Sequence, residues 1–384
     1  LRVLLVIARP TDTGFIDPRT SAAPVLDALD RLGGNVHVDF CEPPTLPELD
    51  RRLTAARETG QPFHVVHFDG HGVYLRQSGV GALCFEQPDA TKDLVEGRRL
   101  GELLAAMRVP LALLEACQTS DLDKEVFGSV APALLQHGVG SVIAFSHSVT
   151  VTAARLLVQA FYEGLCDGAS VGEALLRGRR ALQADPRRDI GRRERIELHD
   201  WHIAQLYQVG EDPVMVPGGA PAKKGGKALR GRPPDKHFPP PPLYGFTGRA
   251  GDLLALRRAL RKHPAVVVHG MGGMGKTSLT REAAHWWART GERAGGACFT
   301  TFERRAGPMV ACRELLAYVH GADAVPGSDE EAWVQAVALF REEPLLWIWD
   351  NFESTLPQYA ADAYPEEDRR DLRRLVRELT DPAY

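Results

Sequence analysis

The chain has 384 residues, of which 44% are hydrophobic and 25% are charged, and its net charge is −4. This length predicts two or three domains of about 100–200 residues each, and the composition is that of a soluble globular protein. The small net charge argues against strong attraction to nucleic acid or membranes, and no run of about 18 apolar residues predicts a membrane-spanning helix.

Six cysteines without a C-x-x-C pair fit a reducing compartment rather than a disulfide framework, so we expect a cytoplasmic protein. The sequence starts at Leu1 inside a strand-like run, with no signal peptide. The missing initiator Met suggests a piece of a longer protein.

In chain order, the first half alternates strand-like apolar runs with helix-like stretches. The predicted strands are 3–8, 36–40, 63–68, 111–114 and 140–145, and the predicted helices are 21–33, 46–60, 97–108, 153–163 and 171–183. Gly33 and Gly60 lie where helix C-caps belong. The alternation predicts an α/β fold with a mostly parallel sheet and flanking helices. Residues 201–213 are expected to add a final edge element.

The composition changes after residue 216. Residues 217–241 are rich in Gly, Pro and Lys/Arg and lack apolar periodicity, which is typical of a linker, flexible at first and then stiffened by prolines. We interpret it as a solvated tether rather than as a binding site for an acidic partner. Residues 1–216 and 242–384 are then two α/β domains.

The second domain begins with a turn and an amphipathic helix at 246–261. We predict a strand at 265–270 ("AVVVHG"), a helix at 276–290 and a buried strand at 345–351 ("LLWIWDN").

Two chemically reactive residues follow successive predicted strands of the first domain, and they can face each other if these strands are adjacent in the sheet. His71 comes after the third strand in "HFDGHG", and Cys117 comes after the fourth in "LLEACQTS", 46 residues later in the chain (from 71 to 117). Functional groups gather at the carboxyl ends of parallel strands, which lie about 4.8 Å apart when adjacent. Cys117 would attack a carbonyl as a thiolate, with His71 as its base. The N–H groups of Gly72 and Cys117 would hold the oxyanion, and the absence of side chains at Gly70 and Gly72 would let a substrate approach.

These two motifs resemble the paired motifs of the CHAT domain, a bacterial branch of the caspase-like cysteine peptidases. The segments "GVGSVIAFSHSVT" and "AFYEGLCDGASVGEALLRGRRAL" also look like that family, and the resemblance covers about residues 1–216. It implies a caspase-like sheet and a His71/Cys117 dyad. In some relatives the residue two positions before the cysteine is acidic and lines the substrate pocket. By that likeness Glu115 implies cleavage after Arg or Lys, and Asp69 could contribute instead.

Other interpretations of these residues remain. A zinc site built from His64, His67, His71 and Cys117 is disfavoured, because His64 and His67 would point to opposite faces of one strand. His147 is the more credible substitute base. The caspase-like domain could also be a scaffold without activity. The remaining cysteines are interpreted as packing residues: Cys41, Cys84, Cys166, Cys298 and Cys312.

The second domain carries a phosphate-binding motif. The sequence G-x-x-x-x-G-K-T runs from Gly270 to Thr277, between a predicted strand and a helix, as in a P-loop. ATP or ADP would be bound by the loop backbone and Lys276, and Mg²⁺ by Thr277 and by Asp350 at the end of a Walker B strand. Glu353 is the available base for an attacking water. The full set of nucleotide-binding residues is Gly270, Gly272, Gly273, Gly275, Lys276, Thr277, Ser278, Asp350 and Arg249.

Residues 242–384 resemble the start of STAND-type (NB-ARC) signalling NTPases, in which a "GRE"-like turn borders the adenine. Here Arg249 matches and Ala250 departs from that pattern. The resemblance stops soon after Walker B, so the P-loop domain is truncated and normal ATP turnover is not expected. The two resemblances together imply a cysteine endopeptidase regulated by an ATP-binding oligomerisation switch, in bacterial defence or programmed cell death. It would act on protein or peptide substrates and self-associate through the NTPase module. The alternative is a non-catalytic nucleotide-gated scaffold. Basic specificity would also permit self-cleavage in the linker at Lys223, Lys224, Lys227 or Arg230.

Overall fold

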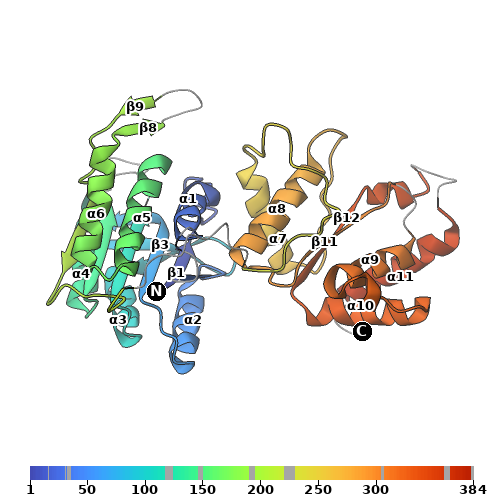
Figure 1. Cartoon of the computed structure of the whole chain (residues 1–384), viewed down its shortest axis with the longest axis horizontal. Helices are drawn as coiled ribbons and strands as arrows, with labels where there is room; N and C mark the ends of the chain where they lie inside the picture. Colours follow the sequence, from blue (N-terminus) through green and yellow to red (C-terminus); the bar gives the residue numbers. More distant parts are fainter. Residues whose placement is uncertain are drawn as a thin grey trace. The chain divides into compact units, whose positions relative to one another are not determined.

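The computed structural model describes residues 1–15, 17–30, 32, 36–116, 124–145, 150–189, 195–219, 230–303, 307–358 and 364–381. The chain folds into two compact units, Leu1–Ala228 and Leu229–Tyr384 (Figure 1). The division falls inside the predicted linker. Among the described segments, no helix is both long enough and apolar enough to cross a membrane.

The first unit is built on a mixed, mostly parallel sheet of eight strands among the described residues. The order is β10-β7-β6-β3-β1-β2, and β4 and β5 extend it from β3. The strands are β1 Arg2–Ile7, β2 His37–Phe40, β3 Val65–Leu75, β4 Val80–Glu86, β5 Lys92–Glu96, β6 Leu111–Ala116, β7 Ser141–Phe145 and β10 Ala204–Gln208. Only β4, β5 and β10 pair antiparallel. The α/β class, the parallel core and the edge element at 201–213 are therefore confirmed.

Helices cover both faces of this sheet. They are α1 Pro18–Asp30, α2 Leu46–Glu58, α3 Gly97–Ala106, α4 Lys124–Gln136, α5 Val151–Cys166 and α6 Val171–Ala184. Even-numbered strand residues such as Val66, Phe68 and Leu114 pack against α2, α3 and α4. Helices α1, α5 and α6 pack side by side on the opposite face, towards which odd-numbered residues of β3 and β6 point (Figure 1). Gly60, just beyond α2, has the positive φ of +68° that favours a glycine there.

Strand β3 is longer than the sequence predicts. The prediction ends it at residue 68, whereas the strand continues through His71 and Gly72 to Leu75. Its first half pairs parallel with β1 and β6, and its second half pairs antiparallel with β4, with His71 opposite Cys84. The predicted end at residue 68 was wrong because β4 supplies a backbone partner for the polar residues that follow it.

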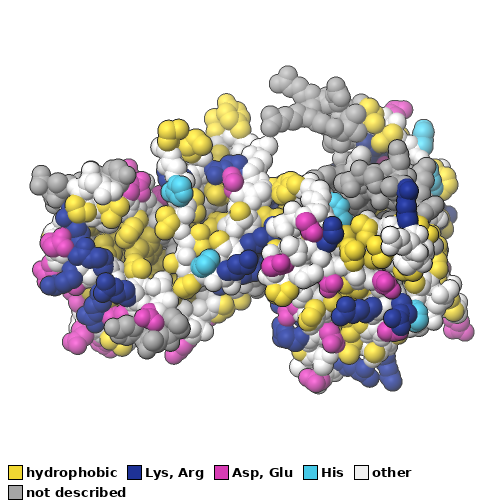
Figure 2. Space-filling model, turned by 180° about the vertical axis from the view of Figure 1, so that it is seen from behind, with side chains coloured by type: hydrophobic (Ala, Val, Ile, Leu, Met, Phe, Trp, Pro, Cys, Tyr) yellow, Lys and Arg dark blue, Asp and Glu magenta, His cyan; other side chains and the backbone are white. Residues whose placement is uncertain are grey.

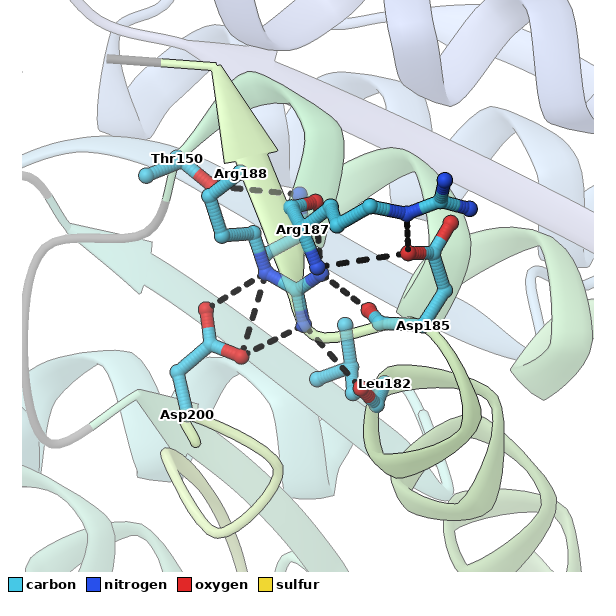
Figure 3. A network of polar contacts seen from close by, with 7 residues as sticks. Thr150, Leu182, Asp185, Arg187, Arg188 and Asp200 are labelled. Carbon is cyan, nitrogen blue, oxygen red and sulfur yellow. Dashed lines mark hydrogen bonds and ion pairs between the residues drawn. The ribbon is translucent and has the colours of Figure 1, made fainter. Parts of the chain in front are cut away.

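A short hairpin, β8 Arg187–Asp189 and β9 Arg195–Glu197, follows α6 and projects beyond it (Figure 1). At its base the guanidinium of Arg188 is fully buried and forms three hydrogen bonds to the carboxylate of Asp200, at 3.2, 2.9 and 2.6 Å (Figure 3). It also donates to the backbone carbonyls of Leu182, Asp185 and Arg187. One side chain thus joins the end of α6, the hairpin and the turn before β10.

The second unit contains a two-stranded parallel sheet, β11 Gly296–Thr301 and β12 Leu345–Asp350. Its helices are α7 Ala250–Lys262, α8 Lys276–Thr290, α9 Pro308–His320, α10 Asp329–Glu342 and α11 Glu366–Thr380, with short 3₁₀ turns at Ala322–Ala324 and Phe352–Thr355. The predicted helices at 246–261 and 276–290 and the strand at 345–351 are confirmed. In the space-filling view, basic and acidic side chains are interspersed on the visible face (Figure 2).

The predicted strand at 265–270 is wrong. This segment has no strand pairing, and Val267 is 84% exposed. Val266 and Val268 are partly buried against a cluster formed by α7, α8 and β12. The side chains of residues 265–270 therefore alternate between partly buried and exposed as in a strand. No described strand pairs with the backbone of this segment, and an apolar pattern alone does not provide a pairing partner.

The end of the predicted linker lies on the second unit rather than in solvent. We call residues 230–239 the strap. Its backbone N–H groups and one arginine of α8 form these hydrogen bonds: Arg230 and Gly231 to Ala288 O, Arg232 to Ala294 O, Asp235 to Ala297 O, and Arg281 Nε to Pro239 O, all between 2.8 and 3.1 Å. The strap thus contacts α8 between Arg281 and Ala288 and lies beside β11.

Candidate active site

The two strands that carry the proposed dyad are neighbours. Strands β3 and β6 pair parallel, with Asp69 opposite Glu115 and Gly70 opposite Ala116. His71 is the next residue on β3, and Cys117 is the next on the other chain segment. Cys117 itself lies outside the described residues. The strand adjacency on which the proposed dyad depends is present, and His71 directly follows the parallel register of β3 with β6.

His71 is buried, and its ring orientation is set by a backbone carbonyl. Its Nε2 atom lies 2.7 Å from the carbonyl oxygen of Gly14, in the segment after β1. A carbonyl oxygen can only accept a hydrogen bond, so Nε2 carries the proton. In a neutral ring the basic lone pair is then on Nδ1, which is the form a general base requires.

Asp69 forms a buried ion pair with a residue that the sequence interpretation did not single out. Arg9, which follows β1, lies with Nη2 2.7 Å from Asp69 Oδ2, and both side chains are almost fully buried. The same guanidinium donates from Nη1 to the Asp69 carbonyl at 2.8 Å. The backbone N–H of Arg9 donates to Glu86 Oε1 at 3.0 Å. The charge of Asp69 is therefore balanced within the fold.

Glu115 has a different kind of partner. Its Oε2 atom lies 3.3 Å from Nε2 of His67, and Nδ1 of His67 lies 3.4 Å from the hydroxyl of Tyr162 on α5. All three side chains are buried on the sheet face that α5 covers. Burial and the charge of Glu115 raise the pKa of Tyr162 well above its usual value, so the phenol stays protonated.

The two glycines near His71 have different surroundings. A Cβ atom at Gly70 would lie 2.6 Å from the ring of Phe68 and 3.3 Å from the Ala8 carbonyl oxygen, so packing alone excludes a side chain there. The space that the sequence interpretation left for a substrate beside Gly70 is thus filled by the protein. Gly72 lies in β3 opposite Leu83. Its role as an oxyanion donor remains a prediction.

The histidines of the zinc alternative have other partners. Nδ1 of His64 accepts the Arg2 backbone N–H at 3.0 Å, and His67 contacts Glu115 and Tyr162. No group of three potential metal ligands is found within the described segments. His147, the substitute base, lies outside them. The cysteines interpreted as packing residues are all buried and reduced: Cys41, Cys84, Cys166, Cys298 and Cys312. Burial raises the pKa of Cys41 to about 12 and that of Cys84 to about 11, which makes both thiols unreactive.

In the second unit, the P-loop motif lies at the N-terminus of α8. Gly273 and Gly275 have φ values of +75° and +77°, which favour glycine, and α8 begins directly afterwards at Lys276. The Lys276 ammonium group donates to the carbonyls of Gly270 and Met271 at 3.0 and 3.3 Å. Gly270, Gly272 and Ser278 belong to the same loop and first helical turn.

Asp350, the predicted Walker B aspartate, lies against the first turn of α8. The Thr277 hydroxyl donates to the two carboxylate oxygens of Asp350, at 2.9 and 3.1 Å. Burial raises the pKa of Asp350, and the nearby charge of Glu353 adds to the effect. Arg249 donates from Nη1 to the carbonyls of Met274 and Gly275 at 2.8 and 3.1 Å. The residues chosen for Mg²⁺ and nucleotide are thus adjacent, and a hydroxyl paired with a carboxylate suits Mg²⁺.

The sequence did not point to Arg9, Gly14 or Tyr162, and it disfavoured His67 as a zinc ligand. One signal was available for Arg9, which directly follows a buried strand at the carboxyl edge of the sheet. His67 stood out as a polar residue between the apolar Val66 and Phe68. Gly14 and Tyr162 carried no signal, since their contacts depend on the path of the chain.

Comparison with known proteins agrees with the first unit. The CHAT domain family matches residues 1–288, beyond residue 216 and into the second unit. No curated protein matches the chain. A similar solved structure is a crystal structure of a protein from Geobacter sulfurreducens, with 12% identity and a TM-score of 0.33, which covers 57% of this chain and 98% of that one. Similarity at this level adds nothing about function. Because the family match covers most of its length, the chain belongs to the CHAT domain family of caspase-like peptidases.

Proposed function

We propose that the first unit is a cysteine endopeptidase in which Cys117 is the nucleophile and His71 the base. The observation that carries the proposal is the register of β3 and β6, with Gly70 opposite Ala116 directly before the two residues. The fixed Nε2–H···O contact of His71 with Gly14 supports it, because it leaves Nδ1 as the basic nitrogen.

The reaction follows from these roles. His71 takes the thiol proton, and the sulfur of Cys117 attacks the peptide carbonyl carbon to form a tetrahedral oxyanion that the Gly72 and Cys117 N–H groups hold. The C–N bond breaks as His71 gives its proton to the leaving amine, and a thioester remains. Water, deprotonated by His71, then hydrolyses the thioester and restores the thiol.

The substrate preference is for Arg or Lys before the scissile bond, with Glu115 rather than Asp69 as the recognising carboxylate. Asp69 already has a cationic partner in Arg9, at 2.7 Å, whereas the partner of Glu115 is a histidine that can be neutral. Glu115 therefore has the unbalanced negative charge that a cationic substrate group would complement.

An Arg-bearing peptide chloromethyl ketone tests the dyad. It is expected to modify Cys117 of the full chain covalently, with loss of cleavage of Arg substrates, and a Cys117→Ala variant is expected to show neither labelling nor cleavage. Intact-mass spectrometry measures the first and a fluorogenic assay the second. A Cys41→Ala variant is the matched control, because that buried thiol has a pKa of about 12. Failure of the native chain to label or cleave, alone or with ATP, would favour the non-catalytic scaffold.

The second unit binds ATP or ADP with Mg²⁺ and acts as the STAND-type switch through which copies of the chain associate, in defence or programmed death. The pairing of Thr277 with Asp350 and the position of Lys276 at the start of α8 support this. Self-cleavage then concerns chiefly Lys223, Lys224 and Lys227, which lie outside the described residues, because the Arg230 side chain donates to the Arg289 carbonyl.

Replacing Lys276 with alanine is expected to weaken nucleotide binding by about 10²-fold, because loss of one partner of a charge-assisted contact costs about 2–5 kcal/mol. Titration with a fluorescent ATP analogue and Mg²⁺ measures the affinity. Lys262→Ala at the exposed end of α7 is the matched control and should bind as the native chain does. Equal affinities for all three proteins would contradict the P-loop assignment.

A further inference from the structure

A buried chain of three polar side chains lies beside the proposed site and has no role in the reaction described above. Tyr162 of α5 contacts Nδ1 of His67 at 3.4 Å, and Nε2 of His67 contacts Glu115 at 3.3 Å. The residues are 0%, 1% and 4% exposed, respectively. Three polar groups placed this deep between a sheet and a helix cost free energy unless each finds a partner.

When Glu115 is ionised, the donors and acceptors of the hydrogen bonds between these three side chains are fixed. A carboxylate only accepts, so His67 donates from Nε2. A neutral imidazole then accepts at Nδ1, and the Tyr162 hydroxyl supplies that proton. In this arrangement the histidine is neutral and the negative charge of Glu115 is retained.

Among the described residues, Asp69 lies opposite Glu115 in the sheet, Arg9 pairs with Asp69, and Tyr162 of α5 contacts His67. Arg9 and Asp69 neutralise each other at 2.7 Å. A carboxylate buried this deeply needs a hydrogen-bond donor, and His67 lies 3.3 Å from it.

We propose that His67, oriented by Tyr162, is the positioning residue that holds and aims the Glu115 carboxylate, and that it thereby determines the preference for a cationic substrate side chain. This inference rests on the proposed peptidase function and on Glu115 as the recognising carboxylate. Neither His67 nor Tyr162 touches the reacting atoms. Their effect is on selectivity, whereas a purely structural role would change stability alone.

The test uses two fluorogenic peptides that differ only in having arginine or its neutral isostere citrulline before the scissile bond. The readout is the ratio of their kcat/KM values for the full chain. We expect arginine to be preferred by about 10²-fold in the native protein, as for a close charge pair. Glu115→Gln should bring the ratio close to one. His67→Leu removes the donor, so its ratio should fall to the same value. His67→Gln can donate from its amide and should keep most of the preference for arginine.

Two further variants make the result decisive. The double variant His67→Leu/Glu115→Gln should show no loss beyond Glu115→Gln, because both changes act through one carboxylate. Tyr162→Phe removes a single oxygen and should lower the ratio severalfold. Thermal unfolding shows whether His67→Leu folds. If it does not, the ratios of Tyr162→Phe and His67→Gln test the proposal instead. A native ratio in His67→Leu, or in Tyr162→Phe if that variant must decide, overturns the proposal even if the melting temperature falls.

Failure of the proposed function gives a different pattern. If cleavage persists in Cys117→Ala, the peptidase assignment itself is wrong. If cleavage depends on Cys117 but Glu115→Gln keeps the native ratio, the dyad stands and both the Glu115 pocket and this inference fall. If only the His67 and Tyr162 variants keep the native ratio, the inference alone fails.

Discussion

Replacing His71 with alanine is expected to lower kcat/KM for cleavage of arginine substrates by about 10³-fold, the scale of general acid–base catalysis. The loss should appear mainly in kcat, because the role proposed for His71 is to transfer protons and not to bind the substrate side chain. His71→Ala should also slow labelling of Cys117 by the chloromethyl ketone, since the thiolate fraction falls without its base. Steady-state kinetics and the rate of mass increase measure the two effects.

His64→Ala is the matched control for this experiment. That histidine precedes the same strand, and its Nδ1 accepts the Arg2 backbone N–H, away from the site. Its loss should leave kcat within about twofold of the native value. Full activity of His71→Ala would rule out His71 as the base and turn attention to His147.

Replacing Arg188 with alanine is expected to destabilise the first unit by about 3 kcal/mol. The change removes the fully buried guanidinium of Figure 3 and leaves three backbone carbonyls and the Asp200 carboxylate without its donors. Loss of one partner of a buried charge pair is among the most costly single substitutions. The shift in the urea midpoint of this unit measures the effect.

The neighbouring Arg187 provides the control. Its side chain is 68% exposed and contacts Asp185 at 3.0 Å, and exposed ion pairs contribute at most about 1 kcal/mol. Arg187→Ala should therefore shift the midpoint little. Similar shifts for the two variants would show that the buried network of Arg188 does not hold the base of the hairpin.

Much of the fold could be predicted because its signals are local. The apolar runs at β1, β3 and β6 are bounded by turn residues, and the intervening helices have amphipathic periods and caps such as Ser170, whose hydroxyl accepts the Glu173 N–H. The parallel arrangement followed from this alternation. The pairing of β3 with β6 then placed Gly70 opposite Ala116, directly before the two residues of the proposed dyad.

The extension of β3 could not be predicted for a physical reason. After Phe68 the sequence "DGHGVYL" is polar and contains two glycines, which is typical of a loop. These polar groups are buried because their partners come from distant segments: Arg9 for Asp69 and the Gly14 carbonyl for His71. A sequence window shows that a residue is polar, but not that its partner lies 60 positions away.

The prediction for residues 265–270 was wrong in the opposite sense, because it gave a strand where the structure has none. Its β-branched residues strongly favour a strand, but a strand also requires a backbone partner, and propensity cannot supply one. In the candidate site, too, local sequence identifies some residues and not others. His71, Glu115 and the P-loop could be chosen by motif, whereas the roles of Arg9, His67 and Tyr162 depend on packing across the sheet face.

The strap determines how mechanical load would enter the second unit. A pull on the chain from the side of the first unit arrives at Arg230, whose backbone N–H bonds to Ala288 near the C-terminal end of α8. The strap then runs towards Pro239, which contacts Arg281 one turn beyond Thr277. Tension would therefore detach the strap from the far end of the helix first. The contact nearest the predicted P-loop, between Pro239 and Arg281, would be the last to break, which shields the N-terminal end of α8 from moderate forces.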